Sequence, residues 1–179
     1  MKKTIFLILG ESGSGKTEIA RELGFYGYKA IQSYTTRPAR KKDEYGHIFC
    51  SDVDYDAFRE KNEIAAYSWF NDYHYFTTRT QLAESDVYVV DPDGIEDLKS
   101  NVKNINFISI YLNVDEDTRV NRMKKRGDSE ETIMNRLSVD QQKFRYKQFD
   151  YCLPNDKLTK TIDIMRYIFD AETDGAYDE

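Results

Sequence analysis

The segment Gly10–Thr17, written GESGSGKT, constrains the fold of this chain more than any other stretch. It matches the pattern G-x-x-x-x-G-K-[ST], which forms a phosphate-binding loop when it joins a buried strand to the start of a helix. The preceding Thr4–Leu9 is a continuous apolar run, typical of a strand buried on both faces. The following Lys16–Leu23 has helical apolar spacing, and Gly24 stands where a left-handed cap is expected. The sequence therefore predicts a strand, a phosphate loop and a helix in succession.

Such a loop offers phosphates a set of backbone N–H groups, because its glycines let successive N–H groups turn toward one point at a helix N-terminus. We expect the Lys16 ammonium to bridge the β- and γ-phosphates of ATP, and the Thr17 hydroxyl to ligate Mg²⁺. Asp91, which ends the run VYVVD, is expected either to approach the metal or the acceptor, or only to form a turn. The predicted nucleotide contacts are Gly10, Glu11, Ser12, Gly13, Ser14, Gly15, Lys16 and Thr17.

The rest of the chain alternates apolar runs with helical patterns. Val87–Val90 and Ile105–Leu112 read as strands, whereas residues 95–102 and 158–165 carry apolar side chains at helical spacing. Strands and helices that take turns predict an α/β fold with a doubly wound parallel sheet.

One region breaks this alternation with turn residues, short β-like pieces and many aromatic residues. We interpret it as an acceptor-binding sub-domain inserted into the sheet, with Trp69 and Phe70 in its core. The predicted boundaries are one domain at 1–170, with a core at 1–32 and 83–170, the sub-domain at about 33–82, a helical lid at about 126–142, and an acidic flexible tail at 171–179.

Composition limits the partners. The 179 residues include 26 Lys and Arg against 32 Asp and Glu, so the surface offers no general attraction to nucleic acid or anionic lipid. Cys50 and Cys152 suggest neither a disulfide framework nor a metal site. The first residues match no signal peptide, and no segment is long enough to span a bilayer. We expect a cytoplasmic protein, monomeric or homodimeric.

Two groups of arginines are candidate phosphate ligands. In SYTTRPAR, Arg37 and Arg40 flank a proline that stiffens the turn, which suits a phosphate approached from two sides. Arg126 ends a helical row of arginines, and Arg136 follows the polar loop RGDSEE, as expected for a lid that neutralises a transferring phosphate. The alternative for each is a solvated turn or a surface ion pair.

These motifs resemble the guanylate kinase family from Thr4 to Ile168. The resemblance is carried by the phosphate loop, SYTTRPAR, the Tyr75 region, VVDPDG, NRMKKRGDSEETIMNRL and YCLPND. It implies a parallel-sheet core, an acceptor-binding sub-domain and a lid, and transfer of the γ-phosphate of ATP to a nucleoside monophosphate.

The resemblance also implies individual roles. Arg126 and Arg136 match lid arginines at the transferring phosphates and, with Lys16 and Arg37, form the expected catalytic set, while Asn155 matches the loop beside the adenine. The implied acceptor residues are Ser33 and Thr77 near the base, Arg37, Arg40 and Tyr75 at the phosphate, and Asp91 facing the nucleoside.

The chain departs from the family at two acceptor positions. Ala66 stands nine residues before Tyr75, where the family has a glutamate that reads guanine, so we expect altered base selectivity, with GMP or dGMP the first acceptors to test. His47 stands where the family has a second phosphate-contacting tyrosine. These departures keep open a kinase similar to ribose 1,5-bisphosphate phosphokinase, and a non-catalytic interaction module is a further alternative.

Overall fold

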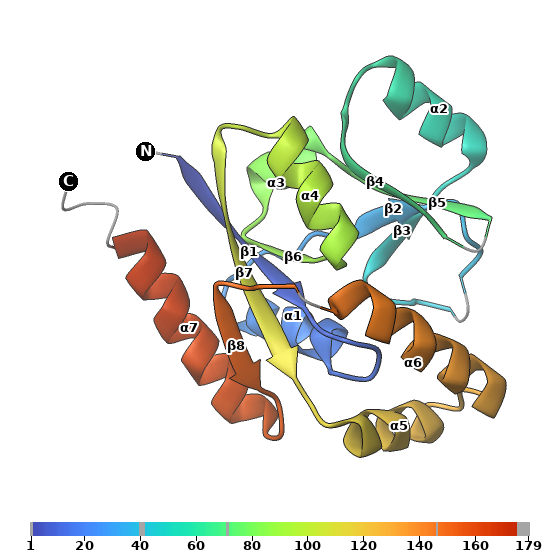
Figure 1. The fold of residues 1–179 in the computed structure, drawn as a ribbon. Helices are drawn as coiled ribbons and strands as arrows, with labels where there is room; N and C mark the ends of the chain where they lie inside the picture. Colours follow the sequence, from blue (N-terminus) through green and yellow to red (C-terminus); the bar gives the residue numbers. More distant parts are fainter. Residues whose placement is uncertain (1, 40–41, 71, 146, 175–179) are drawn as a thin grey trace.

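The computed structural model describes residues 2–39, 42–70, 72–145 and 147–174 (Figure 1). Its first sheet is parallel throughout, in the order β6-β1-β7-β8. The four strands are β1 (Lys3–Leu9), β6 (Val87–Val89), β7 (Ile105–Asn113) and β8 (Tyr151–Pro154). The predicted central strand therefore lies inside the sheet, between β6 and β7.

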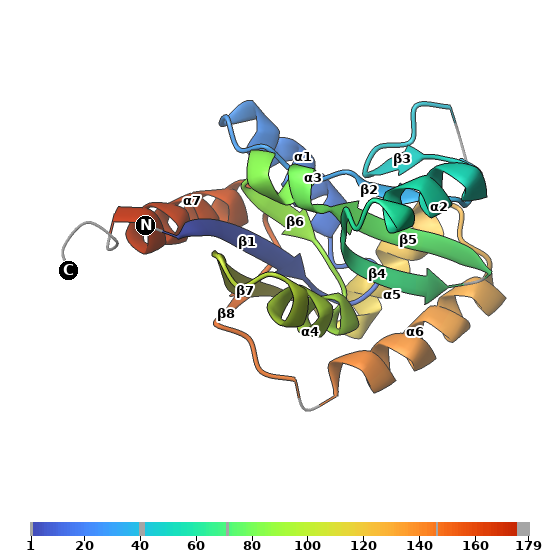
Figure 2. The same cartoon turned by 90° about the horizontal axis from the view of Figure 1, so that it is seen from above.

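Helices cover both faces of this sheet, which confirms the doubly wound α/β prediction (Figure 2). Phe6 and Ile8 of β1 pack toward α1 (Lys16–Phe25) and α7 (Leu158–Asp174). The alternate residues Ile5, Leu7 and Leu9 pack toward α4 (Pro92–Asn101) on the other face. Over the described part of the chain, no helix has the length and apolar character needed to cross a membrane.

A second, mixed sheet has the order β3-β2-β5-β4 and lies beside the first (Figure 1). Its elements, with two helices, are β2 (Ser33–Thr35), β3 (His47–Phe49), α2 (Asp52–Glu60), β4 (Ile64–Phe70), β5 (Tyr73–Thr78) and α3 (Arg79–Glu84). They fall within or next to the segment expected as an insertion. The sheet is tied to the first layer because Ala65 and Ala66 share an apolar cluster with Leu98 of α4.

The two faces of the second sheet differ in chemistry. One face is aromatic: Tyr34 stacks on Phe76 at 5.1 Å, and both rings pack against Phe58 of α2. Strand pairing places Ser68 beside Tyr75, and Ala66 beside Thr77, on the opposite face. We call this second surface the acceptor face; it consists of Ser33, Thr35, His47, Ala66, Ser68, Tyr75 and Thr77.

The expectation that Trp69 fills the sub-domain core is wrong. Strand pairing places Trp69 beside His74 on the aromatic face, where the indole contacts the His74 ring at 4.7 Å and remains 53% exposed. The core is made instead by Phe76, which is 1% exposed, and its neighbours. The Phe70 side chain lies outside the described part of the structure.

Two helices, α5 (Glu116–Lys125) and α6 (Glu130–Phe144), form an arm that crosses below both sheets (Figure 1). Phe144 at the end of α6 packs with Tyr111 of β7 and Phe149, at ring distances of 5.6 and 6.3 Å. The C-terminal end of α6 is therefore anchored to the first sheet.

Several local predictions need correction. The α1 helix includes Gly24, and Gly27 takes the left-handed conformation (φ 92°), because the helix extends to Phe25. The α7 helix reaches Asp174, so the predicted flexible tail is helical at its start, while residues 175–179 lie outside the described residues. The strand β8 and the helices α2 and α3 were not expected, although both helices start at capping boxes, Ser51 with Asp54 and Thr78 with Gln81.

Candidate active site

The phosphate loop can only be made with glycine at its turning points. Gly13 and Gly15 have φ angles of 81° and 96°, in the left-handed region that other residues avoid. A Cβ atom on Gly13 would lie 2.6 Å from the Arg119 carbonyl oxygen, and one on Gly15 would lie 2.6 Å from the Asn155 amide nitrogen. The loop is therefore packed tightly against its supports as well as turned.

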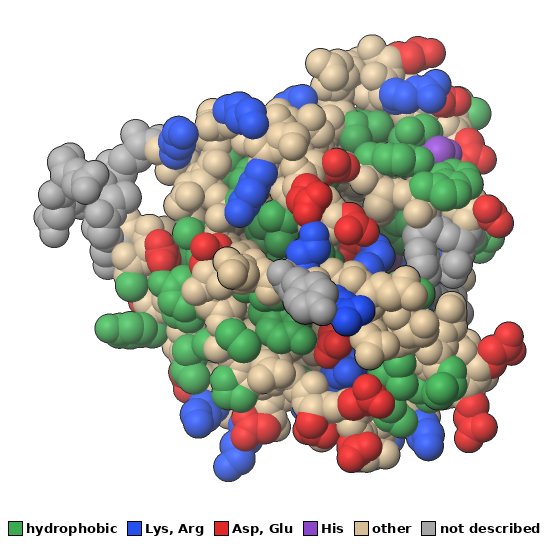
Figure 3. All heavy atoms as spheres, viewed as in Figure 1, with side chains coloured by type: hydrophobic (Ala, Val, Ile, Leu, Met, Phe, Trp, Pro, Cys, Tyr) green, Lys and Arg blue, Asp and Glu red, His purple; other side chains and the backbone are tan. Residues whose placement is uncertain are grey.

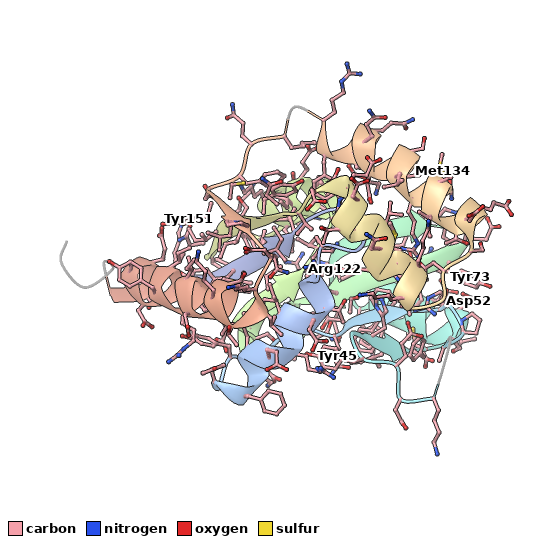
Figure 4. The ribbon with its side chains drawn as sticks, turned by 90° about the horizontal axis from the view of Figure 1, so that it is seen from below. Tyr45, Asp52, Tyr73, Arg122, Met134 and Tyr151 are labelled. Carbon is pink, nitrogen blue, oxygen red and sulfur yellow. The ribbon has the colours of Figure 1, made fainter. Side chains whose placement is uncertain are left out.

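Side chains from α5 and the β8–α7 turn hold the carbonyl groups of this loop. The Arg122 guanidinium donates to the carbonyls of Gly13 and Ser14 at 3.3 Å each and to the Asn155 carbonyl at 2.8 Å. Figure 4 shows Arg122 directed from α5 toward the start of α1. The Asn155 amide donates to the Ser14 carbonyl at 2.7 Å. With the carbonyls held in this way, the loop is preorganised for a phosphate.

A buried ion pair supports the first half of the loop. Arg119 is 4% exposed and pairs with the Glu11 carboxylate at 3.0 Å, while its guanidinium also approaches the Ser12 carbonyl at 3.4 Å. Arg119 and Arg122 belong to the helical row of arginines that Arg126 ends, and both brace the loop. Sequence spacing could not distinguish these roles, because Glu11 lies more than one hundred residues away.

The Lys16 side chain is folded onto its own loop. Its ammonium donates to the carbonyls of Gly10 at 2.5 Å and Glu11 at 3.1 Å. The pKa of Lys16 is lowered to about 8, chiefly by burial; the Asp140 charge opposes this shift, and the positive charges of Arg126 and Arg136 add to it. The lid arginines predicted from the sequence are thus close enough to act on the loop lysine electrostatically.

Both lid arginines contact one carboxylate in the α5–α6 turn. Arg126 donates to the two Asp128 oxygens at 2.9 and 2.5 Å, and Arg136 lies 3.8 Å from Asp128. Asp128 thereby gathers two guanidinium groups on the side of the arm that faces Lys16. Their catalytic role remains a prediction.

The loop also suits a magnesium nucleotide. Among the described residues, no cluster of three or more His, Cys, Asp or Glu side chains could hold a metal ion by itself. Mg²⁺ bound with a nucleotide needs only one or two protein oxygens, since phosphates and waters supply the others. The exposed Thr17 provides a hydroxyl at the first turn of α1, and the buried Ser14 hydroxyl has no hydrogen-bond partner among the described residues. These features fit the predicted metal nucleotide.

On the acceptor side, Arg37 is held in place before any ligand is bound. It is 8% exposed, and its guanidinium donates to the Glu44 carboxylate at 2.8 and 3.3 Å. Burial alone would lower the pKa of Arg37, but hydrogen bonds to Glu44 and Tyr75 raise it, so the charge is secure. Arg40 lies outside the described residues, and its predicted phosphate contact stays a prediction.

His47 lies next to Tyr75, which also bonds to Arg37. Its Nδ1 atom lies 3.0 Å from the Ser33 hydroxyl, and its ring contacts Tyr75 edge to face at 5.7 Å. The strands β2 and β3 place Ser33 and His47 side by side in parallel register. Ser33, His47, Tyr75 and Arg37, which the sequence predicts at the acceptor site, thus come together from separate strands and loops.

The region where the base was expected contains hydroxyl groups and no glutamate. Ala66 is 4% exposed beside Thr77 on β5. The Thr77 hydroxyl donates to the Gln81 amide oxygen at 2.9 Å, and Thr77 also bonds to the buried Tyr88, whose pKa is raised by burial and by Asp91. A base here would meet small side chains and hydroxyls.

Asp91 has two partners in the structure. One carboxylate oxygen accepts from the Gly94 N–H at 2.9 Å and caps α4, as the turn interpretation predicted. The other accepts from the Lys143 ammonium of α6 at 2.6 Å. A second α6 residue, Asp140, accepts from the Ser12 N–H of the phosphate loop at 2.7 Å. Sequence reasoning missed both α6 residues, because nothing in the local pattern shows what that helix faces.

Beside these contacts lies a cavity of about 570 Å³ between the phosphate loop and the last turns of α6. Glu11 and Tyr111 line one side of it, and Gln141, Phe144 and Arg145 line the other. Burial and the Glu11 carboxylate raise the pKa of Tyr111 to about 12, so this wall keeps a neutral hydroxyl. A movement of α6 would change the width of the cavity.

The comparisons with known proteins agree with one another. A family model described as guanylate kinase matches residues 1–172. The guanylate kinase of Coxiella burnetii is 27% identical over 182 residues, covering 96% of this chain and 88% of the relative. That of Syntrophus aciditrophicus is 28% identical over 186 residues, again covering 96% and 88%. The crystal structure of guanylate kinase from Anaplasma phagocytophilum matches with a TM-score of 0.66 at 20% identity, over 96% of this chain and 87% of that one.

Proposed function

Because the chain belongs to the guanylate kinase family of nucleoside monophosphate kinases, we propose that it transfers the γ-phosphate of ATP to the phosphate of GMP or dGMP. The observation that carries this proposal is the complete phosphate loop, with its lysine in the electrostatic field of two lid arginines. The alternatives have less support. A non-catalytic module has no need of an intact Lys16 and Thr17, and the family model and the two sequence relatives described above favour a guanylate kinase over a ribose bisphosphate kinase.

The donor phosphates bind to the loop N–H groups and draw the Lys16 ammonium away from its own carbonyls. Arg126 and Arg136 exchange Asp128 for the transferring phosphoryl group, whose charge they neutralise as it moves. An acceptor phosphate oxygen attacks the γ-phosphorus as the bond to the ADP oxygen breaks. No general base is required, because that acceptor oxygen is already ionised at neutral pH.

The Thr17 hydroxyl would hold magnesium together with the donor phosphates, and the metal would supply neutralising charge at those phosphates. Asn155 contributes to the donor site through the loop it braces, and its contact with adenine remains part of the proposal. Arg37, Arg40 and Tyr75 bind the acceptor phosphate, and His47 lies against Tyr75.

The base is selected by Ser33, Thr77 and Asp91, without a glutamate at position 66. A carboxylate that accepts from the N1 and N2 groups of guanine supports strong selectivity, so its absence lowers discrimination between bases. We expect GMP and dGMP to be accepted, with a preference over AMP smaller than the ~10² that such a contact commonly supports.

The test is an acceptor panel. The purified protein is incubated with ATP, Mg²⁺ and each nucleoside monophosphate or deoxynucleotide, and ribose 1,5-bisphosphate is included for the alternative kinase. ADP release and the phosphorylated product are measured against a blank without acceptor. A product from GMP or dGMP supports the proposal, whereas turnover only with ribose 1,5-bisphosphate, or none above the blank, would overturn it.

An Ala66→Glu variant tests the base assignment. If position 66 faces the base, the new carboxylate raises the GMP to AMP ratio of kcat/KM by about 10², at some loss of stability because the site is buried. Ala66→Gln is the uncharged control of similar size. An unchanged ratio in a folded Ala66→Glu protein contradicts the assignment.

A further inference from the structure

One face of α6 contacts both halves of the site. Asp140 and Lys143 are three residues apart and therefore neighbours on the helix surface. Asp140 binds the Ser12 N–H of the donor loop at 2.7 Å, while Lys143 binds Asp91 at 2.6 Å and Asp93 at 2.9 Å. We call Asp140 and Lys143 together the α6 clasp. Figure 3 shows basic and acidic side chains side by side where α4 faces the end of α6.

Asp140 accepts a hydrogen bond from a backbone N–H group of the phosphate loop that a donor nucleotide would use. The carboxylate lies on a backbone N–H of the phosphate loop, and its charge acts on Lys16. A bound triphosphate brings several negative charges to the same loop and the same lysine. Because like charges at such distances repel strongly in a partly buried site, Asp140 and the donor phosphates compete.

Lys143 forms an ion pair with Asp91, the carboxylate predicted on the acceptor side. Asp91 uses one oxygen for the α4 cap, and its other oxygen accepts from Lys143, so a sugar or base must compete with the Lys143 ammonium for that second oxygen. Asp93 adds a second acceptor for the same ammonium. The clasp therefore satisfies a donor-loop N–H and an acceptor-side carboxylate from a single rigid helix.

We propose that the α6 clasp couples the two substrates: donor phosphates displace Asp140 from the loop, the movement of α6 withdraws Lys143, and Asp91 becomes available to the acceptor nucleoside. The inference rests on the proposed function, since it concerns the same site. Coupling of this kind is reciprocal, so acceptor binding also favours the donor.

The experiment measures MgADP and GMP binding by calorimetry, each alone and in the presence of the other. In the wild-type protein, MgADP is expected to tighten GMP binding by about fivefold. Asp140→Asn keeps an oxygen for the Ser12 N–H but removes the charge, so it is expected to bind MgADP about fivefold more tightly and to lower the coupling ratio toward one. Lys143→Gln tests the other contact independently and is also expected to lower the ratio.

Matched controls separate the clasp from general effects of charge. Lys147→Gln removes the exposed ion pair with Glu96 of α4, just beyond the end of α6, and Asp117→Asn removes an exposed charge from α5. Both are expected to leave the coupling ratio unchanged. Amide hydrogen exchange of residues 130–144 provides a second readout, which is expected to rise in Asp140→Asn and in the wild-type protein with MgADP.

The outcomes distinguish the two levels of proposal. A wild-type protein that neither binds MgADP nor transfers phosphate contradicts the proposed function itself. The clasp alone is overturned by a different result: the wild-type protein binds MgADP and transfers phosphate normally. In that case Asp140→Asn has unchanged or weaker affinity for MgADP, and Lys143→Gln has an unchanged coupling ratio.

Discussion

The phosphate loop and the acceptor face differ in how many contacts define them. The shape of the loop is fixed by several independent constraints: the glycine backbone conformations, and hydrogen bonds from Arg119, Arg122 and Asn155. The acceptor face is a sheet surface of small and hydroxyl side chains, with one buried arginine held by Glu44. A substitution almost anywhere in the phosphate loop disturbs the backbone that binds phosphate. On the acceptor face, a single side-chain substitution changes which ligand is bound.

Lys16→Met is the strongest way to test the donor half. Phosphoryl transfer is expected to fall by about 10³-fold, because the developing charge loses its main cation. The melting temperature at pH 7 is expected to rise, since the folded protein no longer holds a buried ammonium whose pKa is lowered. Activity is measured by ADP release and stability by thermal melting. The exposed Lys125→Met is the control, and wild-type activity in Lys16→Met would contradict the assignment.

Arg37→Ala tests the acceptor half. The kcat/KM for the acceptor is expected to fall by about 10², because the phosphate loses a preorganised guanidinium. Stability is expected to fall by about 2 to 3 kcal/mol, since Glu44 loses two hydrogen bonds in a buried setting.

The affinity of this variant for MgADP is measured alongside and should not change, because Arg37 belongs to the other half. Arg59→Ala removes an exposed ion pair on α2 and serves as the control. Equal losses of donor and acceptor affinity would show that the two halves are not separable at Arg37.

Gly13→Ala tests whether the phosphate loop depends on its glycine conformation and on its close packing against Arg119. The substitution forces a left-handed φ and a Cβ 2.6 Å from the Arg119 carbonyl, so unfolding free energy should fall by about 2 kcal/mol, with loss of MgADP binding. Gly24→Ala is the matched control: it lies inside α1 with nothing within 4 Å, and should stabilise the protein by roughly 0.5 to 1 kcal/mol. Urea denaturation measures both, and equal effects would contradict the argument.

The smallest expected effect is a pH dependence of the donor half alone. MgADP affinity should be about tenfold weaker at pH 9 than at pH 7, because Lys16 loses its proton near pH 8 in the free protein. Stability responds in the opposite direction. Between about pH 8 and 10.5 the unfolded chain binds more protons at Lys16, so this residue's contribution to unfolding free energy rises with pH. Calorimetry across this range measures the affinity, and a flat profile would contradict the lowered pKa.

The sequence predicted those elements whose signals are local. The buried β1, the α1 helix and the loop between them follow from an apolar run, a helical pattern and a glycine motif. It failed where a partner distant in sequence decides the outcome. Trp69 looked like core because nothing local shows that α2 packs on Phe76 of the same sheet face but leaves the indole half exposed. The strand β8 is too short to stand out from its neighbours. The capping boxes of α2 and α3 are the local sequence signals that mark these two helix starts.

The sequence by itself therefore determined the doubly wound fold and the place of the phosphate loop in it, since that loop is a continuous backbone motif between a strand and a helix. Only the tertiary structure decided what surrounds that loop. It turned Arg119 and Arg122 into braces, placed His47 against Ser33, and brought Asp140 and Lys143 from one helix onto both halves of the site. Side chains acquire such roles through packing between segments far apart in the chain, and the spacing of residues within one segment does not predict that packing.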